Sequence, residues 1–340
     1  MSDAFRPRGG RVAIRPVVPA AIGLVAAAAA MVFPSMFAIT PRAASRAELA
    51  QAAPSALDSR AAAAMRTMRE AEALITAAKA EAAVPAEVAG DAAGLIGGES
   101  TPLVTTLGSL EAKRTATNPL WAAVLTRRLS AEGIGPGDVI AAGFSGSFPG
   151  LNLAVMAAAR ALGAELVAVS SVTASTWGAN QPGFTWPEIE CRVVRRGILP
   201  RASVAIAAGG DDDNARELEP DARAMAGRIR DTAAACLGAV ALRPSDLRDA
   251  VRQRLSIYRV AANGRPIALY VNVGGTSASL GRSIAVLRLR SGFAPPVPFD
   301  RSEDRGVIAM FAEQHVRILT LLNIRDLAIR WGVPLAGPAQ

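Results

Sequence analysis

Short apolar runs alternate with longer segments of helical pattern along the chain from Asp138 onward. The runs are apolar at consecutive positions rather than at every second one, which is typical of parallel strands buried on both faces. They predict strands at 139–144, 165–170, 203–208, 266–273 and 316–322. The pattern therefore favours an α/β fold, doubly wound around a mostly parallel sheet.

The segments that connect these runs carry helix signals. The predicted helices cover 149–162, 186–197, 220–236, 246–260 and 324–331. Thr185 and Glu188 have the spacing of a capping box at the start of the second helix. Gly163 is expected to end the first helix, and Ser245 to cap the fourth.

The chain before Asp138 has a different character. Residues 45–84 are rich in Ala, Glu, Arg and Met, and they predict one or two helices that form a stalk or an opening bundle. Glycines in 85–98 interrupt this pattern. Residues 99–119 are expected to form a polar loop, and 121–129 a helix.

An uncharged stretch lies near the N-terminus. Residues 16–40 carry no charge over 25 positions, and a helix needs about 20 apolar residues to cross a bilayer. Because the preceding flank 1–15 carries a net charge of +3, the positive-inside rule places it in the cytoplasm. We therefore expect a basic tail, a transmembrane helix, a helical segment at 41–98 and an α/β domain at 99–340. The domain would lie in the periplasm or outside the cell; a cleaved signal peptide is the alternative.

Four polar loops follow four of the predicted strands, at 143–147, 170–180, 209–214 and 272–277. The carboxyl ends of parallel strands lie at one edge of a sheet, where ligands bind. The alternative is that these residues only form turns and helix caps. The candidate ligand-binding residues come from these loops, with Asn152 from the predicted helix that follows the first loop: Ser147, Asn152, Ser171, Trp177, Asn180, Gly209, Gly210, Asp211, Asn272, Gly274, Gly275 and Ser277.

Ser145 is the candidate nucleophile if the protein is an enzyme. The stretch GFSGS (143–147) approximates the G-x-S-x-G nucleophile elbow, although its last position is Ser. Ser145, Asp211 and His315 follow the chain order of a hydrolase triad, but a single match of order is weak evidence. Lys113 is a second candidate base, because a desolvated lysine can accept a proton. The competing interpretation is an ordinary salt bridge from Lys113 to Glu111 or Asp138.

Other motifs narrow the chemistry. The chain has no P-loop lysine and no G-x-G-x-x-G fingerprint, so neither ATP nor a dinucleotide is expected as a cofactor. Asp211, Asp212 and Asp213 could hold a divalent cation, but a solvated acidic helix entry is the favoured interpretation, and no metal is expected. Cys191 and Cys236 lack the spacing of a metal site. We expect buried free thiols, with a disulfide possible in an exported domain.

The formal net charge of +8 is unevenly distributed. The segment 240–292 has nine arginines and two acids, so it carries a charge of +7 (9 − 2). Such a segment can attract an anionic polymer or lipid, or it can simply form a solvated helix face. Nucleic acid is not expected as a partner, because aromatic residues are not interleaved with the basic ones.

Several sequence blocks resemble a membrane-anchored family known as poly-gamma-glutamate system proteins, encoded beside polyglutamate synthase genes. The matching blocks are TTLGSLEAKRTATNP (105–119), GFSGSFPGLNLAV (143–155), SSVTASTWGANQPGFTWPEIE (170–190), YVNVGGTSASLG (270–281) and LLNIRDLAIRWGVP (321–334). Where this chain has GGDDDN (209–214), the family is richer in glycine. The resemblance implies a place in the production, processing or export of an anionic capsule polymer rather than one reaction.

Three hypotheses follow from these observations. The first is a membrane-anchored protein that binds anionic polyglutamate or a glutamyl precursor at the carboxyl edge of the sheet. The second is a γ-glutamyl or amide hydrolase or transferase with Ser145 as nucleophile. The third is a structural subunit that joins the synthase or export subunits through the 45–84 helix. Whether the protein is an enzyme stays open at this point.

Overall fold

The computed structural model describes residues 55–84, 94–283, 285, 288–294 and 304–337. The chain separates into two units, Met1–Ala52 and Ala53–Gln340, and every described residue belongs to the second. The predicted basic tail (1–15) and transmembrane helix (16–40) lie outside the described residues. No helix within the described ranges is both long and apolar enough to cross a membrane.

A seven-stranded sheet forms the centre of the described unit. Its strands, in spatial order, are β6 (Val240–Ala241), β5 (Ser203–Ala207), β3 (Glu165–Ser171), β2 (Val139–Phe144), β7 (Ile267–Val273), β9 (Arg317–Leu321) and β8 (Gly292–Ala294). All neighbours are parallel except β8 and β9. The chain runs outward from β2 to β6 and then returns to place β7 on the other side of β2. The structure thus confirms an α/β fold with a mostly parallel sheet.

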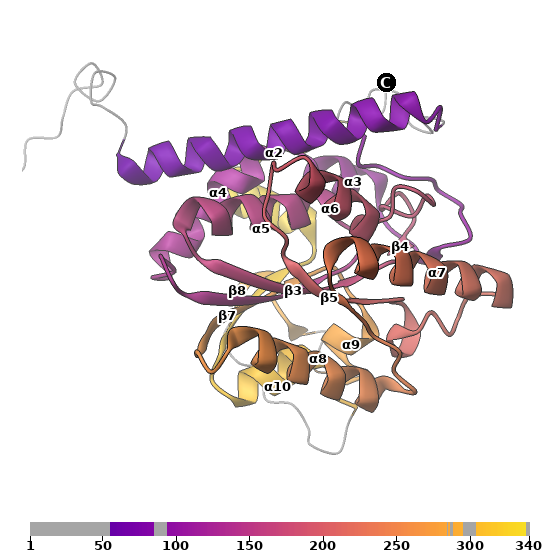
Figure 1. The fold of residues 1–340 in the computed structure, drawn as a ribbon. Coiled ribbons are helices and arrows are strands. Elements are labelled where there is room, and N and C mark those ends of the chain that lie inside the picture. Colours follow the sequence, from indigo (N-terminus) through magenta and orange to yellow (C-terminus); the bar gives the residue numbers. More distant parts are fainter. Residues whose placement is uncertain (1–54, 85–93, 284, 286–287, 295–303, 338–340) are drawn as a thin grey trace, which may run out of the picture. The chain divides into compact units, whose positions relative to one another are not determined.

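Helices cover both faces of this sheet (Figure 1). The helices on one face are α2 (Ala56–Glu81), α4 (Leu120–Ala131), α5 (Pro149–Leu162), α6 (Trp186–Arg195), α7 (Pro220–Leu237) and α11 (Ile324–Trp331). The helices on the other face include α8 (Leu247–Ala262), α9 (Ser277–Leu280) and α10 (Val307–Glu313). α5 is buried along most of its length, because α2 and α4 pack over it. The many alanines of α2 and α5 allow this close packing.

Three features differ from the sequence-based expectation. The expected loop 99–119 contains β1 (Val104–Thr106) and α3 (Leu110–Ala116). β1 pairs with β4 (Ala174–Ser175) in a separate two-stranded sheet, where Thr106 lies opposite Ser175. Asp246, not Ser245, caps α8, because the Asp246 side chain accepts the N–H of Asp249.

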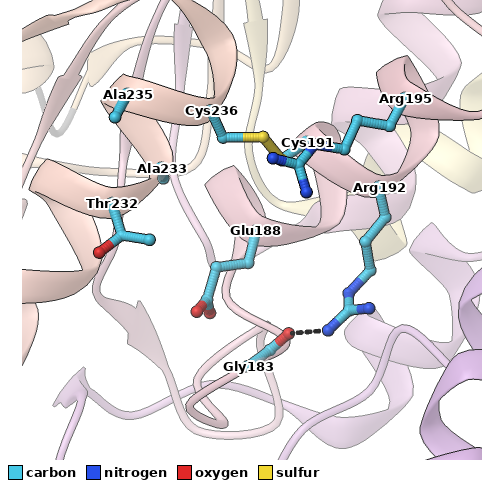
Figure 2. Close-up of a pocket in the computed structure, with 9 residues that line it drawn as sticks. All are labelled: Gly183, Glu188, Cys191, Arg192, Arg195, Thr232, Ala233, Ala235 and Cys236. Carbon is cyan, nitrogen blue, oxygen red and sulfur yellow. Dashed lines mark hydrogen bonds between the residues drawn. A yellow bond between two sulfur atoms is a disulfide. The ribbon is translucent and has the colours of Figure 1, made fainter.

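Cys191 and Cys236 form a disulfide between α6 and α7 (Figure 2). Their Cα atoms are 6.2 Å apart, within the usual range for a disulfide. The expectation of free thiols is therefore wrong. The two helices pack against each other, and this packing brings together two cysteines 45 residues apart in the sequence.

Candidate active site at the sheet edge

A pocket of about 300 Å³ lies at the carboxyl edge of the sheet, where the strand order reverses between β2 and β7. All four predicted loops contribute to it. Its lining residues are Thr105, Thr106, Ser145, Ser147, Thr173, Gly210, Asp211, Glu217, Gly275, Thr276 and Ser277. Six of them are predicted site residues, and the sequence pattern gave no signal for the other five, Thr105, Thr106, Thr173, Glu217 and Thr276.

The loop after β2 is held in place by its own polar groups and by the loop after β7. Ser145 Oγ accepts the N–H of Ser147 at 3.2 Å, and Asn152 Nδ2 donates to the carbonyl of Ser145 at 2.9 Å. Gly274 has a φ of 83°, and a Cβ there would collide with Ser145 Oγ. Asn272 Nδ2 donates to the Gly274 carbonyl at 2.6 Å. Asn152 and Asn272 therefore position the pocket loops by bonding to their backbone.

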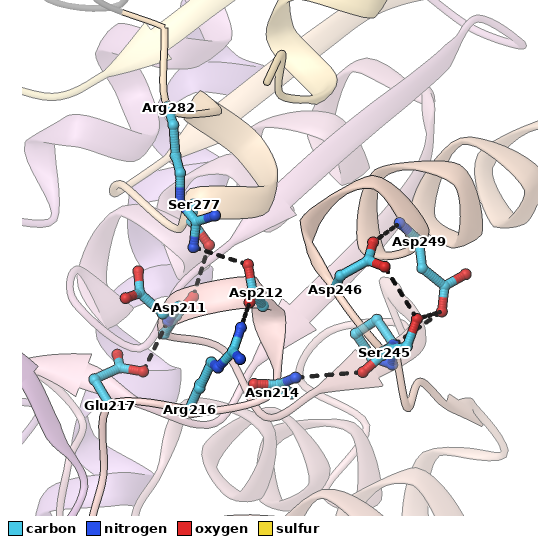
Figure 3. A network of polar contacts seen from close by, with 12 residues as sticks. Asp211, Asp212, Asn214, Arg216, Glu217, Ser245, Asp246, Asp249, Ser277 and Arg282 are labelled. Carbon is cyan, nitrogen blue, oxygen red and sulfur yellow. Dashed lines mark hydrogen bonds and ion pairs between the residues drawn. The ribbon is translucent and has the colours of Figure 1, made fainter. Parts of the chain in front are cut away.

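Hydroxyl groups dominate the pocket wall. Thr173 is only 3% exposed, and its hydroxyl has no hydrogen-bond partner in the described part of the chain. Ser277 Oγ donates to the carbonyl of Gly210 at 2.9 Å, which joins the loops after β7 and β5 (Figure 3). Among the described residues, no Lys, Arg or His side chain lines this pocket. The wall therefore offers donors and acceptors but no positive charge.

Two carboxylates lie at the pocket, Asp211 and Glu217 (Figure 3). Glu217 Oε2 accepts the backbone N–H of Asp211 at 2.9 Å. Partial burial raises the pKa of Glu217, and the neighbouring negative charge of Asp211 adds to this effect. Neither side chain forms an ion pair within the described ranges.

Asp212 and Asp213 are not solvated, contrary to the expected acidic helix entry. Asp213 is fully buried and forms a bidentate pair with Arg254, at 2.6 and 2.8 Å. Asp212 pairs with Arg216 at 2.8 Å and with Arg282 at 2.9 Å. These arginines satisfy both carboxylates, so of the three aspartates only Asp211 faces the pocket. The described residues contain no group of three or more His, Cys, Asp or Glu arranged to hold a metal ion.

Lys113 is buried beside the pocket loops, with 3% of its surface exposed. Its Nζ donates to Ser175 Oγ at 2.6 Å and to the Ser147 carbonyl, and it lies 4.0 Å from the centre of the Phe148 ring. Burial lowers the pKa of Lys113 to about 7. No hydrogen bond joins Lys113 to Ser145 in the described part of the chain.

The expected salt bridge of Lys113 is wrong. Glu111 pairs with Arg325 at 2.6 Å, and Asp138 accepts the N–H of Gly135 at 2.8 Å. His315 is exposed and precedes β9, so it lies at the amino edge of the sheet, away from the pocket. This placement argues against a triad that contains Ser145 and His315.

The other predicted site residues do not line the pocket. Ser171 Oγ accepts from Arg254 Nη2 at 3.0 Å, and Asn180 bonds the N–H and carbonyl of Gly98 at 2.9 and 2.8 Å. Trp177 and Gly209 have positive φ angles of 63° and 86°. These residues shape the loops, and a direct contact from them to a ligand stays a prediction.

The basic segment 240–292 is largely neutralised by acids from the fold. Six of its nine arginines form ion pairs in the described structure: Arg243, Arg248, Arg252, Arg254, Arg265 and Arg282. Most of these partners lie outside the segment, which explains why counting charge along the segment overstated its basic character.

No family model, no curated protein and no solved structure matches this chain.

Proposed function

We propose that this protein is a membrane-anchored component of a system that makes or exports poly-γ-glutamate, and that its sheet-edge pocket binds the polymer or a glutamyl precursor. The observation that carries the proposal is the convergence of four polar loops on one pocket at the point where the strand order reverses. Ligands of open α/β sheets bind at this position. Four of the blocks that resemble the polyglutamate family contain or adjoin this pocket.

The size of the pocket favours a short ligand. A volume of about 300 Å³ is at the lower end of the range for ligand sites. It suits one or two glutamyl units rather than a long stretch of chain. The Ser and Thr hydroxyls of the wall can donate to carboxylates and accept from amides.

Two features support a position outside the cytoplasm. Disulfides persist in oxidising compartments, and Cys191 and Cys236 form one. The uncharged stretch 16–40, with its basic flank, has the pattern of an anchor that leaves the following residues outside. We therefore propose a single-pass protein of the cell membrane with a cytoplasmic N-terminus.

Calorimetry with the full-length protein in detergent tests the binding function, with short γ-glutamyl oligomers as the probe. We expect Thr173→Val to weaken binding about tenfold, because it removes the hydroxyl of a buried residue that lines the pocket. Thr232→Val, at an exposed position of α7, is the matched control and should bind normally. If the wild-type protein binds no oligomer at low salt, this function is wrong.

A γ-glutamyl hydrolase or transferase is the second candidate, and the Lys113 contact with Ser175 favours it. A neutral lysine could take the hydroxyl proton as the serine oxygen attacks the amide carbonyl, and then give it to the departing amine. Each of two serines is a candidate nucleophile, because Ser175 contacts Lys113 and Ser145 lines the pocket. The test therefore replaces both serines. The assay measures the release of glutamate from γ-glutamyl oligomers. If none of the variants Ser145→Ala, Ser175→Ala and Lys113→Met slows this release, the enzyme hypothesis fails.

A further inference from the structure

The charges at the pocket are opposite to those that would attract a polyanion. Asp211 and Glu217 line it, and no basic side chain does so within the described residues. An interior unit of poly-γ-glutamate carries a carboxylate and no amine. Two carboxylates near such a unit would repel it, because like charges a few ångströms apart interact unfavourably at a protein surface.

The geometry of the loop holds the Glu217 carboxylate against the backbone of Gly210 and Asp211. The N–H of Asp211 fixes Glu217 Oε2 at 2.9 Å. Gly210 has a φ of 67°, and a Cβ at this position would overlap the Glu217 carboxylate. The chain therefore needs glycine here to bring Glu217 against the loop that carries Asp211. The Asp211 carboxylate itself has no hydrogen-bond or ion-pair partner within the described ranges.

A separate observation indicates that the pocket takes a polar ligand. Thr173 is 97% buried, contributes to the wall, and leaves its hydroxyl without a partner in the described structure. The Thr173 oxygen is not among the enclosed unpartnered atoms of the described residues, so it is accessible from the pocket. A ligand with a polar group at this wall would satisfy Thr173, while its other end reaches the two acids.

We infer that the pocket recognises the free amino end of a glutamyl ligand, with Asp211 and Glu217 holding its ammonium group and the Ser and Thr hydroxyls binding its carboxylate. The inference rests on the proposed function and specifies which part of the ligand is bound. A terminal glutamyl unit is the part of the polymer that carries both groups. Hydrogen bonds between two charged partners are stronger than neutral ones, so loss of the ammonium group should weaken binding.

The test compares three probes on the full-length protein in detergent: a γ-glutamyl oligomer with a free amine, the same oligomer acetylated at its amine, and free glutamate. We expect acetylation to weaken binding at least tenfold. Asp211→Asn and Glu217→Gln should weaken binding of the free-amine oligomer about tenfold and leave the acetylated oligomer unaffected. Asp221→Asn, an exposed acid in the first turn of α7, is the control and should bind like the wild type.

The outcomes separate this inference from the proposed function. If both oligomers bind equally well, the amine is not recognised, and the inference is overturned while polymer binding stands. If neither oligomer nor glutamate binds, the proposed function itself is wrong. If glutamate binds as tightly as the free-amine oligomer, the ammonium site is supported and the precursor is identified as its ligand.

Discussion

The disulfide between Cys191 and Cys236 provides the most direct test of the fold. It joins α6 to α7 across a sequence separation of 45 residues. Replacing both cysteines by serine removes this cross-link and leaves two small polar side chains. The same cross-link can be removed from the wild-type protein with a thiol reductant, so the two perturbations check each other.

The expected loss follows from the length of the closed loop. For about 45 residues the chain-entropy relation gives about 13 cal/mol/K, or about 4 kcal/mol at 25 °C. Domains are stable by only about 5–15 kcal/mol, so this is a large share of the total. Cys191 also packs in the apolar cluster between α7 and the sheet, so the serine variant should lose somewhat more than the reduced wild type.

Urea unfolding of the full-length protein in detergent, followed by circular dichroism, measures this loss. The Cys191→Ser/Cys236→Ser variant should unfold at lower urea than the oxidised wild type, and reductant should shift the wild type but not the variant. A thiol assay on the denatured, unreduced wild type should find no free cysteine. If the oxidised wild type and the variant agree within about 1 kcal/mol, the cross-link does not constrain the unfolded chain as we expect.

Three further predictions concern buried charge and the pocket. Because burial lowers the pKa of Lys113 from its ordinary 10.5 to about 7, the folded state binds fewer protons than the unfolded state between these values. The free energy of unfolding of the wild type should therefore rise between these pH values, by up to about 1.4 kcal/mol per pH unit. Urea unfolding measured at several pH values from 6 to 10 should show this rise in the wild type and not in Lys113→Met. Arg254→Met leaves the buried Asp213 carboxylate unpaired and should cost about 3–5 kcal/mol in urea unfolding, whereas the exposed Arg259→Met should cost almost nothing. Gly274→Ala should lower stability by about 1–3 kcal/mol and abolish ligand binding in calorimetry, because its positive φ and its contact with Ser145 both resist a side chain. Wild-type affinity in that variant would show that the loop can move aside.

The elements predicted well are those where periodicity and end signals agree. The bounds of β2, α5 and α11 match their predictions, and Gly163 ends α5 with a left-handed conformation as expected. β6 and β8 have only two and three residues, too few for a pattern to emerge. They are strands because β5 and β9 provide backbone groups with which they pair. The local sequence does not reveal this pairing.

The site could be predicted only as far as strand order determines it. The loops after β2, β3, β5 and β7 converge because their strands are parallel neighbours in one sheet. Glu217 and Thr105 come from segments beyond these strand ends, and tertiary packing alone brings them to the pocket. The burial of Lys113 could not be predicted from the sequence for the same reason. Lys113 lies in a polar stretch, and it is buried by residues more than 30 positions away.

Charge is the property for which local sequence was the poorest guide. Arg254, Arg265 and Arg282 find their acids 41, 100 and 70 positions away. A segment with an excess of arginine is therefore not necessarily an anion-binding surface, because the fold selects which charges are paired. Asp211 and Glu217 form no ion pair in the described structure, and both lie at the pocket. Their charges are therefore the ones that this edge presents to a ligand.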